Sequence, residues 1–420
     1  MEAAEGSKVA YLDKIDCSNL REGMFVQELD RPWLETSFMF QGFYIKSSEE
    51  IEELKKYCEY VYVNRERSEI DPRIFHQIIT GDAPEETQAT VTTRIPLGTS
   101  TWHDTIPVEE ELETARTVYE ECNAAIESIY SAAGEEGVID VKEASKTTTG
   151  IVDSVLRNPD AFMLLQRIKS RDEYRYTHAI NSCALAATFC RHLGFSKNEI
   201  LDISMGALML DVGSIKLPDS LIETNEPLNP LAMKMLRHHV QFGVEILDKT
   251  PELPQVVREM VQTHHERING KGYPRGLKGD QIPVSGRIAA IVDCYDAMIS
   301  TRPYKQKVSP MAAISTIYNW RNIDFQEDLI EQFIQCIGAY PTGSLVELTS
   351  GQIGIVMSQN RIRRLYPKIL LILTAEGEPY ENPHMLDLWD YFQKTKGEAL
   401  EIRKAIEAEE LGIDPADYYL

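Results

Sequence analysis

The chain has 420 residues, of which 43% are hydrophobic, and its 66 acidic and 43 basic side chains give a formal net charge of −23. This length can hold two or three domains, whereas the negative charge argues against a nucleic-acid partner because such a surface repels phosphate backbones. The sequence has no apolar run near the ~18 residues of a membrane span and no apolar core for a signal peptide, so we expect a soluble cytoplasmic protein without membrane association.

Residues 8–66 predict a small α+β module. The segments LREGMFVQEL and SFMFQGFYIK are predicted strands, SSEEIEELKKYC is a predicted helix with a serine cap, and YVYVN is a further strand. Residues 67–139 follow as a polar linker, which extends to residue 105, and an acidic helix over residues 107–133. We expect this helix to pack on the next domain or on a second copy of the chain in a homodimer.

From residue 140 to residue 341 the apolar period is helical almost throughout, which predicts an all-helical domain. Residues 342–420 change character. TGSLVELTSGQIGIVM is a predicted hairpin with its turn at Ser350 and Gly351, YPKILLILT is a further strand, and the charged segment GEALEIRKAIEAEEL is a predicted closing helix. The expected fold is therefore mainly α, with a small α+β module before the helical domain and a short β-rich extension after it.

Within the helical region, six side chains with metal-binding chemistry interrupt faces that should be buried. His239 is aligned with Gly243, Ile246 and Leu247 on one face of an amphipathic helix. Asp211 interrupts the apolar run GALMLDVGSI. The other four are His178, His264, His265 and Asp293, each of which continues or interrupts an apolar stripe of its own segment.

Each of these residues, taken singly, has a commoner structural explanation. A lone histidine on an apolar face is more often a hydrogen-bonded core residue than a ligand, and Asp211 can simply cap the turn at Gly213. Taken together, two buried carboxylates and four inward-facing histidines need a common explanation, because a buried carboxylate is costly unless it is paired or bound to metal. Nitrogen and oxygen donors together suit Fe, Mn, Zn, Ni or Co. The seven cysteines are scattered, with no CxxC pair, which argues against a cysteine-rich zinc site and fits a reducing compartment.

The stretch HHERINGKGYPRGLKGDQIP, followed by RIAAIVDCYDAMISTRPYK, closely resembles the HD-GYP family, the HD-domain phosphohydrolases of bacterial cyclic di-GMP signalling. The residues in register are His264, His265, Glu266, Asn269, Gly270, Gly272, Tyr273 and Pro274. The resemblance extends over residues 140–341. Residues 8–66 resemble a module found in front of some HD-GYP domains, and the strand-rich segment after residue 341 is similar to an extension that often follows them.

The resemblance implies a metal centre that hydrolyses cyclic di-GMP or a related cyclic dinucleotide. The implied metal ligands are His178, Asp211, His239, His264, His265 and Asp293. Asp211 would be the bridging carboxylate and the catalytic residue, and two-metal hydrolysis uses such a site to activate water and stabilise the developing charge. Gly270, Gly272, Tyr273 and Pro274 would form a loop linked to substrate access and to contact with GGDEF-domain proteins.

Two expected groups are missing from this pattern. Where the family has a segment like LLHDIGKIGIP, this chain has LMLDVGSIKLP. Leu210 therefore replaces a metal-binding histidine and Ser214 replaces a phosphate-contacting lysine. Lys216 lies two residues further on and, if the helix persists, points elsewhere. Tyr174 occupies the position at which some relatives place an extra carboxylate, which argues against a trinuclear centre.

The two losses fall on one side of the implied centre. One ion would rely on His178, residue 210, Asp211 and Asp293, and it drops to three ligands. The other ion would use the set Asp211, His239, His264 and His265, which is complete. We therefore expect one well-formed divalent-metal site, for Fe, Mn, Ni or Zn, and a weak second site.

The magnitude of the impairment follows from typical single losses. Even outer-shell changes at metal sites cost ~10–100-fold, and loss of a preorganised donor to a transition-state oxyanion costs ~10²–10³-fold. If the two losses are independent, hydrolysis should fall at least roughly 10³-fold. Three functions stay open at this point: a slow cyclic di-GMP phosphodiesterase, a non-catalytic module that senses nucleotide or docks on GGDEF-domain proteins, and a helical scaffold that binds no metal.

Overall fold

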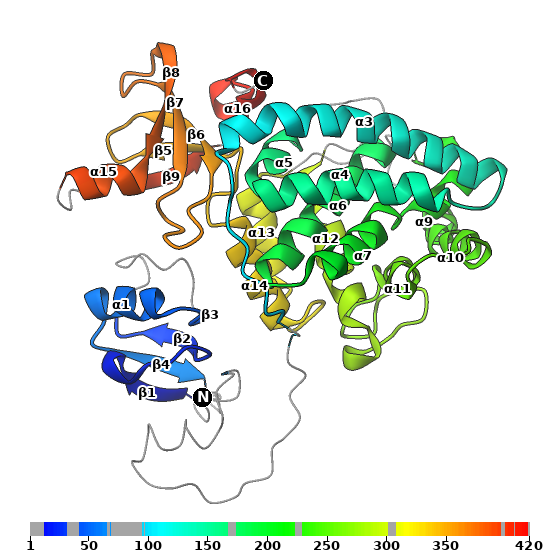
Figure 1. Cartoon of the computed structure of the whole chain (residues 1–420), viewed down its shortest axis with the longest axis horizontal. Coiled ribbons are helices and arrows are strands. Elements are labelled where there is room, and N and C mark those ends of the chain that lie inside the picture. Colours follow the sequence, from blue (N-terminus) through cyan, green and yellow to red (C-terminus); the bar gives the residue numbers. More distant parts are fainter. Residues whose placement is uncertain are drawn as a thin grey trace, which may run out of the picture. The chain divides into compact units, whose positions relative to one another are not determined.

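The computed structural model describes residues 12–31, 42–64, 68, 95, 97–166, 174–222, 229–300, 308–395, 400–406 and 408–418. The chain divides into two compact units, one formed by residues before 95 together with residues 360–365, and the other by residues 95–359 together with 366–420. The fold is mainly helical with two β-sheets, as the sequence predicts (Figure 1). No helix among the described residues is long and apolar enough to cross a membrane.

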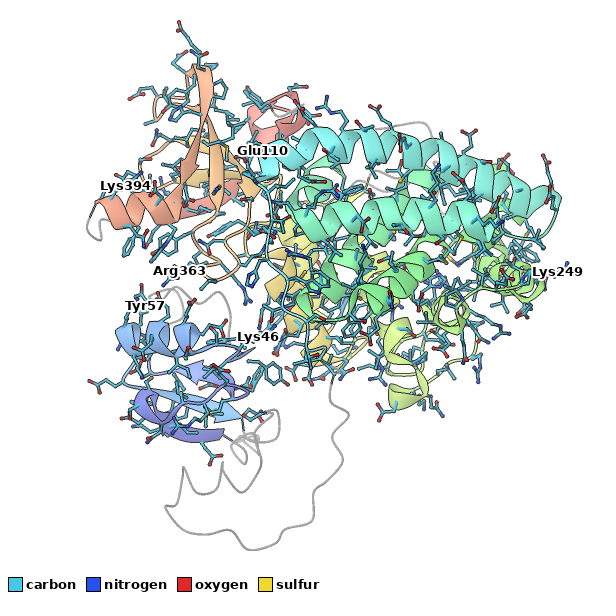
Figure 2. The ribbon with its side chains drawn as sticks, in the orientation of Figure 1. Lys46, Tyr57, Glu110, Lys249, Arg363 and Lys394 are labelled. Carbon is cyan, nitrogen blue, oxygen red and sulfur yellow. The ribbon has the colours of Figure 1, made fainter. Side chains whose placement is uncertain are left out.

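In its described residues, the first unit consists of a four-stranded antiparallel sheet, the α-helix α1 and a short 3-10 helix. The strands are β1 (Leu12–Asp16), β2 (Phe25–Leu29), β3 (Phe43–Tyr44) and β4 (Tyr60–Asn64), in the order β1-β4-β2-β3. The helix α1 (Ser48–Tyr57) begins after Ser47, whose side chain accepts a hydrogen bond from the backbone of Glu50. Figure 2 labels Lys46, which precedes α1 by two residues, and Tyr57, the last residue of α1.

The elements of this unit largely match the sequence prediction. The predicted strands at 20–29 and 60–64 and the predicted helix at 47–58 are confirmed by β2, β4 and α1. The predicted strand at 37–46 is described only from residue 42 onward, where β3 lies, and residues 32–41 lie outside the described part of the chain. β1 was not predicted, and it pairs with β4 along its whole length.

The second unit contains a bundle of helices. The longer ones are α3 (Val108–Glu135), α4 (Val141–Arg157), α6 (Tyr174–His192), α7 (Lys197–Leu208), α10 (His239–Lys249), α11 (Gln255–Thr263), α12 (Val284–Ile299), α13 (Pro310–Asn319) and α14 (Glu327–Ile337). The shorter ones are α5 (Pro159–Leu165), α8 (Asp219–Ile222), α9 (Pro230–Leu236) and the 3-10 helices η3 (Val212–Lys216) and η4 (Gly279–Gln281). This run confirms the predicted helical region.

The acidic helix predicted at 107–133 is α3, which packs against α4, α5 and α6 (Figure 1). Its apolar side chains recur every three or four residues and are buried, while its many glutamates mostly face solvent. One glutamate is an exception: Glu111 is fully buried, and Arg157 at the end of α4 donates hydrogen bonds of 2.7 and 2.8 Å to it. The helix therefore packs on the helical domain of its own chain.

The end of the predicted linker is docked rather than free. The backbone of Gly98 donates a 2.9 Å hydrogen bond to the carbonyl of Leu193, and the Trp102 indole donates one of 2.9 Å to the carbonyl of Phe195. A Cβ at Gly98 would lie 1.8 Å from the carbonyl oxygen of Gly194, so two glycines allow this close backbone approach. Residues 69–94 of the predicted linker lie outside the described part of the chain.

The C-terminal sheet corrects one prediction. Its strands are β5 (Leu345–Leu348), β6 (Ile353–Ser358), β7 (Lys368–Leu373), β8 (Pro379–Asp387) and β9 (Ile402–Ile406), in the antiparallel order β8-β7-β6-β5-β9. The hairpin β5–β6 and the strand β7 are confirmed. The predicted closing helix over 397–411 is wrong at its centre, where β9 pairs with β5. A spacing of four residues between Ile402 and Ile406 fits both a helix and a strand, and the pairing decides between them. Short helices α15 (Leu388–Lys394) and α16 (Ala408–Leu411) flank this strand.

Candidate metal centre

The six side chains selected from the sequence come from five parts of the second unit and meet at one place. His178 lies on α6 and Asp293 on α12. Asp211 directly precedes η3, and His239 is the first residue of α10. His264 and His265 follow the last residue of α11. They form two groups, each with potential ligand atoms within 4.8 Å of one another: Asp211, His239, His264 and His265 in one, and His178, Asp211 and Asp293 in the other.

Asp211 belongs to both groups, and its two carboxylate oxygens face different neighbours. Oδ1 lies 3.2 Å from Nε2 of His239 and 3.8 Å from Nε2 of His264. Oδ2 lies 3.7 Å from Nε2 of His178. The Asp211 side chain is 25% exposed, whereas those of His178 and His264 are buried, so the carboxylate lies at the solvent side of the centre.

Glycines explain how Asp211 comes so close to His239. A Cβ at Gly213 would lie 2.0 Å from the carbonyl oxygen of His239 and 2.2 Å from the backbone nitrogen of Gly243. Real Cβ contacts are not that short, so only glycine allows η3 to lie directly on the first turn of α10. The buried face of α10 that the sequence predicts is therefore pressed against the segment that carries Asp211.

The hydrogen bonds of two histidines determine which ring nitrogen faces the centre. Nδ1 of His239 lies 2.8 Å from the carbonyl oxygen of Leu236, and Nδ1 of His264 lies 2.9 Å from that of Val261. A carbonyl can only accept, so each Nδ1 carries the proton and donates it, which leaves an Nε2 lone pair on each ring. The two Nε2 atoms lie 3.3 Å apart. Two lone pairs at this distance repel unless a cation lies between or beside them.

Burial favours the neutral form of His264 and His265. It lowers the pKa of His264 below its usual value, against the opposing charges of Asp293 and Asp211. It lowers the pKa of His265 further, and the neighbouring His264 adds to the shift. Neutral imidazole is the form that binds metal, so the pKa shifts of these two histidines favour metal binding.

The pKa of His178 shifts upward, in the opposite direction to the pKa values of His264 and His265. Burial by itself would lower the pKa of His178, but hydrogen bonds with Asp293 and Asp296 raise it to about 10. Nε2 lies 3.1 Å from Oδ1 of Asp293, and Nδ1 lies 2.6 Å from Oδ2 of Asp296. Burial would raise the pKa of the Asp293 carboxyl, but the hydrogen bond from His178 holds it well below its usual range. A buried histidine between two carboxylates marks a place that favours positive charge.

Asp296 is a site residue that the sequence prediction did not include. It is fully buried on α12, one turn beyond Asp293, and its second oxygen Oδ1 has no hydrogen-bond partner among the described residues. Carboxylates in this position typically orient a ligating histidine and raise its basicity. The helical period places Asp296 on the same face of α12 as Asp293, three residues further on. This spacing is the sequence signal that could have identified Asp296 as a site residue.

The two substituted positions bring no ligand atom. Leu210 is 1% exposed and apolar. Ser214 is 7% exposed, and its hydroxyl has no hydrogen-bond partner among the described residues. The segment from Val212 to Lys216 is the 3-10 helix η3 and not an α-helix. The exposed Lys216 ammonium lies 5.8 Å from the centroid of the Phe242 ring. The side chain of Tyr174 lies outside the described set.

The glycine-rich loop after His265 holds Tyr273 over the centre. A Cβ at Gly272 would lie 2.4 to 2.5 Å from backbone atoms of Arg267, Glu266 and His265. The Tyr273 ring stacks on the His265 ring, with centroids 4.5 Å apart and planes 30° apart. The buried carboxylate of Glu266 accepts hydrogen bonds of 2.7 and 2.9 Å from the backbones of Arg275 and Leu277, which closes the loop. The bond between Tyr273 and Pro274 is cis.

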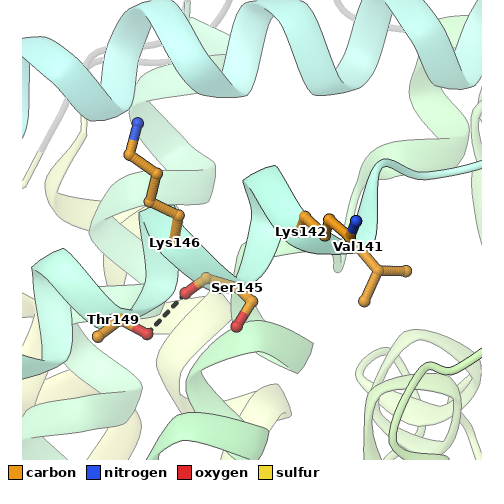
Figure 3. Close-up of a pocket in the computed structure, with 5 residues that line it drawn as sticks. All are labelled: Val141, Lys142, Ser145, Lys146 and Thr149. Carbon is orange, nitrogen blue, oxygen red and sulfur yellow. Dashed lines mark hydrogen bonds between the residues drawn. The ribbon is translucent and has the colours of Figure 1, made fainter.

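These donors fit a divalent metal. They combine neutral imidazoles, whose other nitrogens are tied to carbonyls, with carboxylates held in a partly buried position. A separate hollow runs along α4 and is lined by Val141, Lys142, Ser145, Lys146 and Thr149. It brings lysine and hydroxyl groups but no histidine or carboxylate (Figure 3), so the chemistry of a metal site lies at the histidine cluster.

The six residues of the centre lie within a part of the chain that matches a known domain. Residues 163–324 match the HD domain model, and residues 12–144 match a domain of unknown function. The chain is 30% identical over 383 residues to a cyclic di-GMP phosphodiesterase of Pseudomonas aeruginosa, which covers 90% of this chain and 89% of the relative. It is 30% identical over 200 residues to 3′3′-cGAMP-specific phosphodiesterase 2 of Vibrio cholerae, which covers 47% of this chain and 36% of that protein.

A solved structure of an HDG“Y”P protein from Bdellovibrio bacteriovorus aligns with a TM-score of 0.46 at 14% identity, over 77% of this chain and 98% of that one.

Proposed function

Because this chain belongs to the HD-GYP family and is a homologue of cyclic di-GMP phosphodiesterases, we propose that it is a metal-dependent cyclic di-GMP phosphodiesterase whose hydrolysis is impaired by Leu210 and Ser214. The proposal rests on one observation, the asymmetry of the two groups around Asp211. One group has four potential ligands and the other has three. Binding of the dinucleotide should therefore be better retained than its cleavage.

The complete group supports one firmly held ion. We propose that Asp211, His239, His264 and His265 are its ligands, with Asp211 as a bridging carboxylate. The neutral state of His264 and His265 supports this assignment, as do the carbonyl acceptors behind His239 and His264. A divalent ion bound there would lower the pKa of a bound water and polarise the phosphodiester.

The depleted group supports a weak second ion at most. His178, Asp211 and Asp293 are its proposed ligands, and buried Leu210 adds none. The His178 ring lies between Asp293 and Asp296, at 3.1 and 2.6 Å, and no fourth ligand is added to this group. A site with three ligands should bind metal more weakly than its neighbour with four.

The chain's own residues have separate tasks in the reaction. Asp211, whose side chain is 25% exposed at the solvent side of the centre, can accept a proton from an attacking water. Tyr273 covers His265 and helps to exclude bulk water from that side. Ser214 offers a hydroxyl where relatives would offer a positive charge, so the developing negative charge on the phosphate is less well stabilised.

A metal count combined with a turnover assay on one preparation tests this proposal. Cleanly purified protein should hold about one tightly bound divalent ion per chain and convert cyclic di-GMP to its linear product slowly, yet faster than the Asp211→Ala variant. A rate equal to that of Asp211→Ala would exclude the phosphodiesterase. A preparation without any metal, even after incubation with Mn or Fe, would support the scaffold function instead.

A second function is favoured by the same two substitutions: a non-catalytic module that senses nucleotide or docks on GGDEF-domain proteins. Both changes remove catalytic groups and leave the loop of Gly272 and Tyr273 intact. Calorimetry with cyclic di-GMP and with 3′3′-cGAMP separates the two functions. Binding without turnover would support the module, and turnover above the Asp211→Ala control would support the enzyme.

A further inference from the structure

Arg237 lies over the ring of Tyr273, which itself stacks on a proposed metal ligand. Its guanidinium carbon is 4.7 Å from the centroid of the Tyr273 ring. The same ring also stacks on His265, at 4.5 Å between centroids. A guanidinium and an imidazole therefore both contact the Tyr273 ring, and the imidazole belongs to a proposed metal ligand. Cations over tyrosine faces are attracted by the ring quadrupole.

Both partners of this contact are connected to the centre through the backbone. Arg237 is two residues before His239, and its backbone donates a 3.1 Å hydrogen bond to the carbonyl of Met233 at the end of α9. His239 in turn donates from Nδ1 to Leu236, the residue before Arg237. On the other side, the backbone of Tyr273 donates a 3.2 Å hydrogen bond to the carbonyl of His265. The position of the guanidinium is thus set by the same backbone that sets the ligands.

The charge of Arg237 is available for a ligand. Its side chain is exposed, and no carboxylate among the described residues forms an ion pair with it. Stacking on a ring leaves the planar N–H edge of a guanidinium free for two parallel hydrogen bonds, the geometry that suits phosphate.

Another cation near the centre is already engaged. Arg267 donates hydrogen bonds to the carbonyls of His264 and Glu266 and lies over the Phe325 ring, 5.0 Å from its centroid. Its guanidinium therefore supports the backbone that follows α11, and fewer of its donors are left for a ligand. Among the described residues, no side chain or carbonyl accepts a hydrogen bond from the Arg237 guanidinium, so its donors can face a ligand.

We propose that Arg237 binds a phosphate oxygen of the cyclic dinucleotide and takes over the charge that is absent at Ser214. This inference rests on the proposed function, because it names the residue that holds the same substrate. The phosphate-binding cation would then lie on the side of the complete group, His239 and His265, instead of beside the depleted group. Substrate would be held by the side of the centre that keeps its metal ligands.

Calorimetric titration of the metal-loaded protein with cyclic di-GMP tests the assignment. Hydrogen bonds to charged groups contribute enough that Arg237→Ala should weaken binding about 10- to 100-fold. Arg237→Lys should lose part of this, because an ammonium lacks the planar edge. Lys234→Ala is the matched control: it removes an exposed cation three residues earlier, on α9, and should change the dissociation constant less than about twofold.

Two further readouts distinguish substrate binding from a structural role. The Kd of Arg237→Ala should depend less steeply on salt than that of the wild type, because one phosphate contact is lost. Adding Ser214→Lys to Arg237→Ala should recover at least part of the affinity, since it restores a cation at the centre. The bound-metal content of Arg237→Ala should equal that of the wild type.

The outcomes are separable. Wild-type affinity in Arg237→Ala overturns the assignment and leaves the proposed function in place. Metal loss in Arg237→Ala also overturns it, because the residue would then be a support for His265. No binding by the wild type removes the proposed function and this inference together.

Discussion

Oδ2 of Asp296 lies 2.6 Å from Nδ1 of His178, and both side chains are buried. This contact directs the other ring nitrogen, Nε2, toward Asp293 and Asp211. Asp296 therefore acts on the depleted group through His178, without offering an oxygen to either group of potential ligands. Its effect should be confined to that group.

Asp296→Asn should weaken the second metal-binding step and spare the first. The amide keeps the shape of the side chain and removes the negative charge that supports His178, and such changes typically cost ~10–100-fold in metal affinity. Competition with a chelator of known affinity measures the two steps. Asp153→Asn, on the surface where Asp153 pairs with Lys197, is the control and should match the wild type. An equal loss at both steps would contradict the division into two groups.

Leu210→His combined with Ser214→Lys should raise hydrolysis of cyclic di-GMP. The pair restores one ligand and one phosphate-contacting cation, and the gain in kcat/KM should reach about 10³-fold if the effects are independent. Each single substitution should give less. Leu210→Asn supplies a polar side chain without an imidazole and should give no gain. An unchanged rate in the double variant, with two metals bound, would place the limitation elsewhere in the chain.

The helical period predicted the candidate site to a useful extent. His239 shares a buried face with Gly243, Ile246 and Leu247, as the sequence indicates. That period can say which face of a helix is buried, but it cannot say which faces meet. The convergence on Asp211 depends on the contact of Gly213 with α10, and the pairing of His178 with Asp296 depends on the packing of α6 against α12. These long-range contacts leave no local signature.

The fold shows the same limit at its C-terminus. The segment around Ile402 and Ile406 has the charge and spacing of an amphipathic helix, yet it forms β9. Pairing with β5, whose partner residues lie 54 to 61 positions earlier, overrides the local preference, as β-propensity often depends on neighbouring strands. The helices of the second unit, with longer periodic patterns, were predicted more completely.

The stability of the first unit should depend on the ionisation of Asp30. Burial would raise the pKa of the Asp30 carboxyl, but hydrogen bonds from Arg31, from the Glu59 backbone and from the Cys58 thiol hold it below its usual value. A depressed folded-state pKa contributes stability above the unfolded pKa of about 3.9, and that contribution is lost as pH falls through the folded pKa.

Calorimetric scans of the wild type and Asp30→Asn between pH 3 and pH 6 check this dependence. The wild type should unfold at a higher temperature than Asp30→Asn at pH 6. This difference in unfolding temperature should shrink toward pH 3 as Asp30 becomes protonated. Other carboxyls titrate alike in both proteins and do not change the difference. A difference that stays constant with pH would mean that the hydrogen bonds of Asp30 matter and its charge does not.

Gly272→Ala should displace Tyr273 from His265. The added Cβ would lie 2.4 to 2.5 Å from three backbone positions, none of which can rotate away, so the loop has to shift at a cost of about 1–3 kcal/mol in unfolding free energy. The affinity for cyclic di-GMP should fall with it, because the stack under Arg237 is lost. Gly279→Ala is the control in the same loop: nothing lies within 4 Å of its Cβ, although its φ of +47° carries some strain. It should lose some stability and keep nucleotide affinity. Equal affinity losses in the two variants would show that general loop strain, and not the position of Tyr273, controls binding.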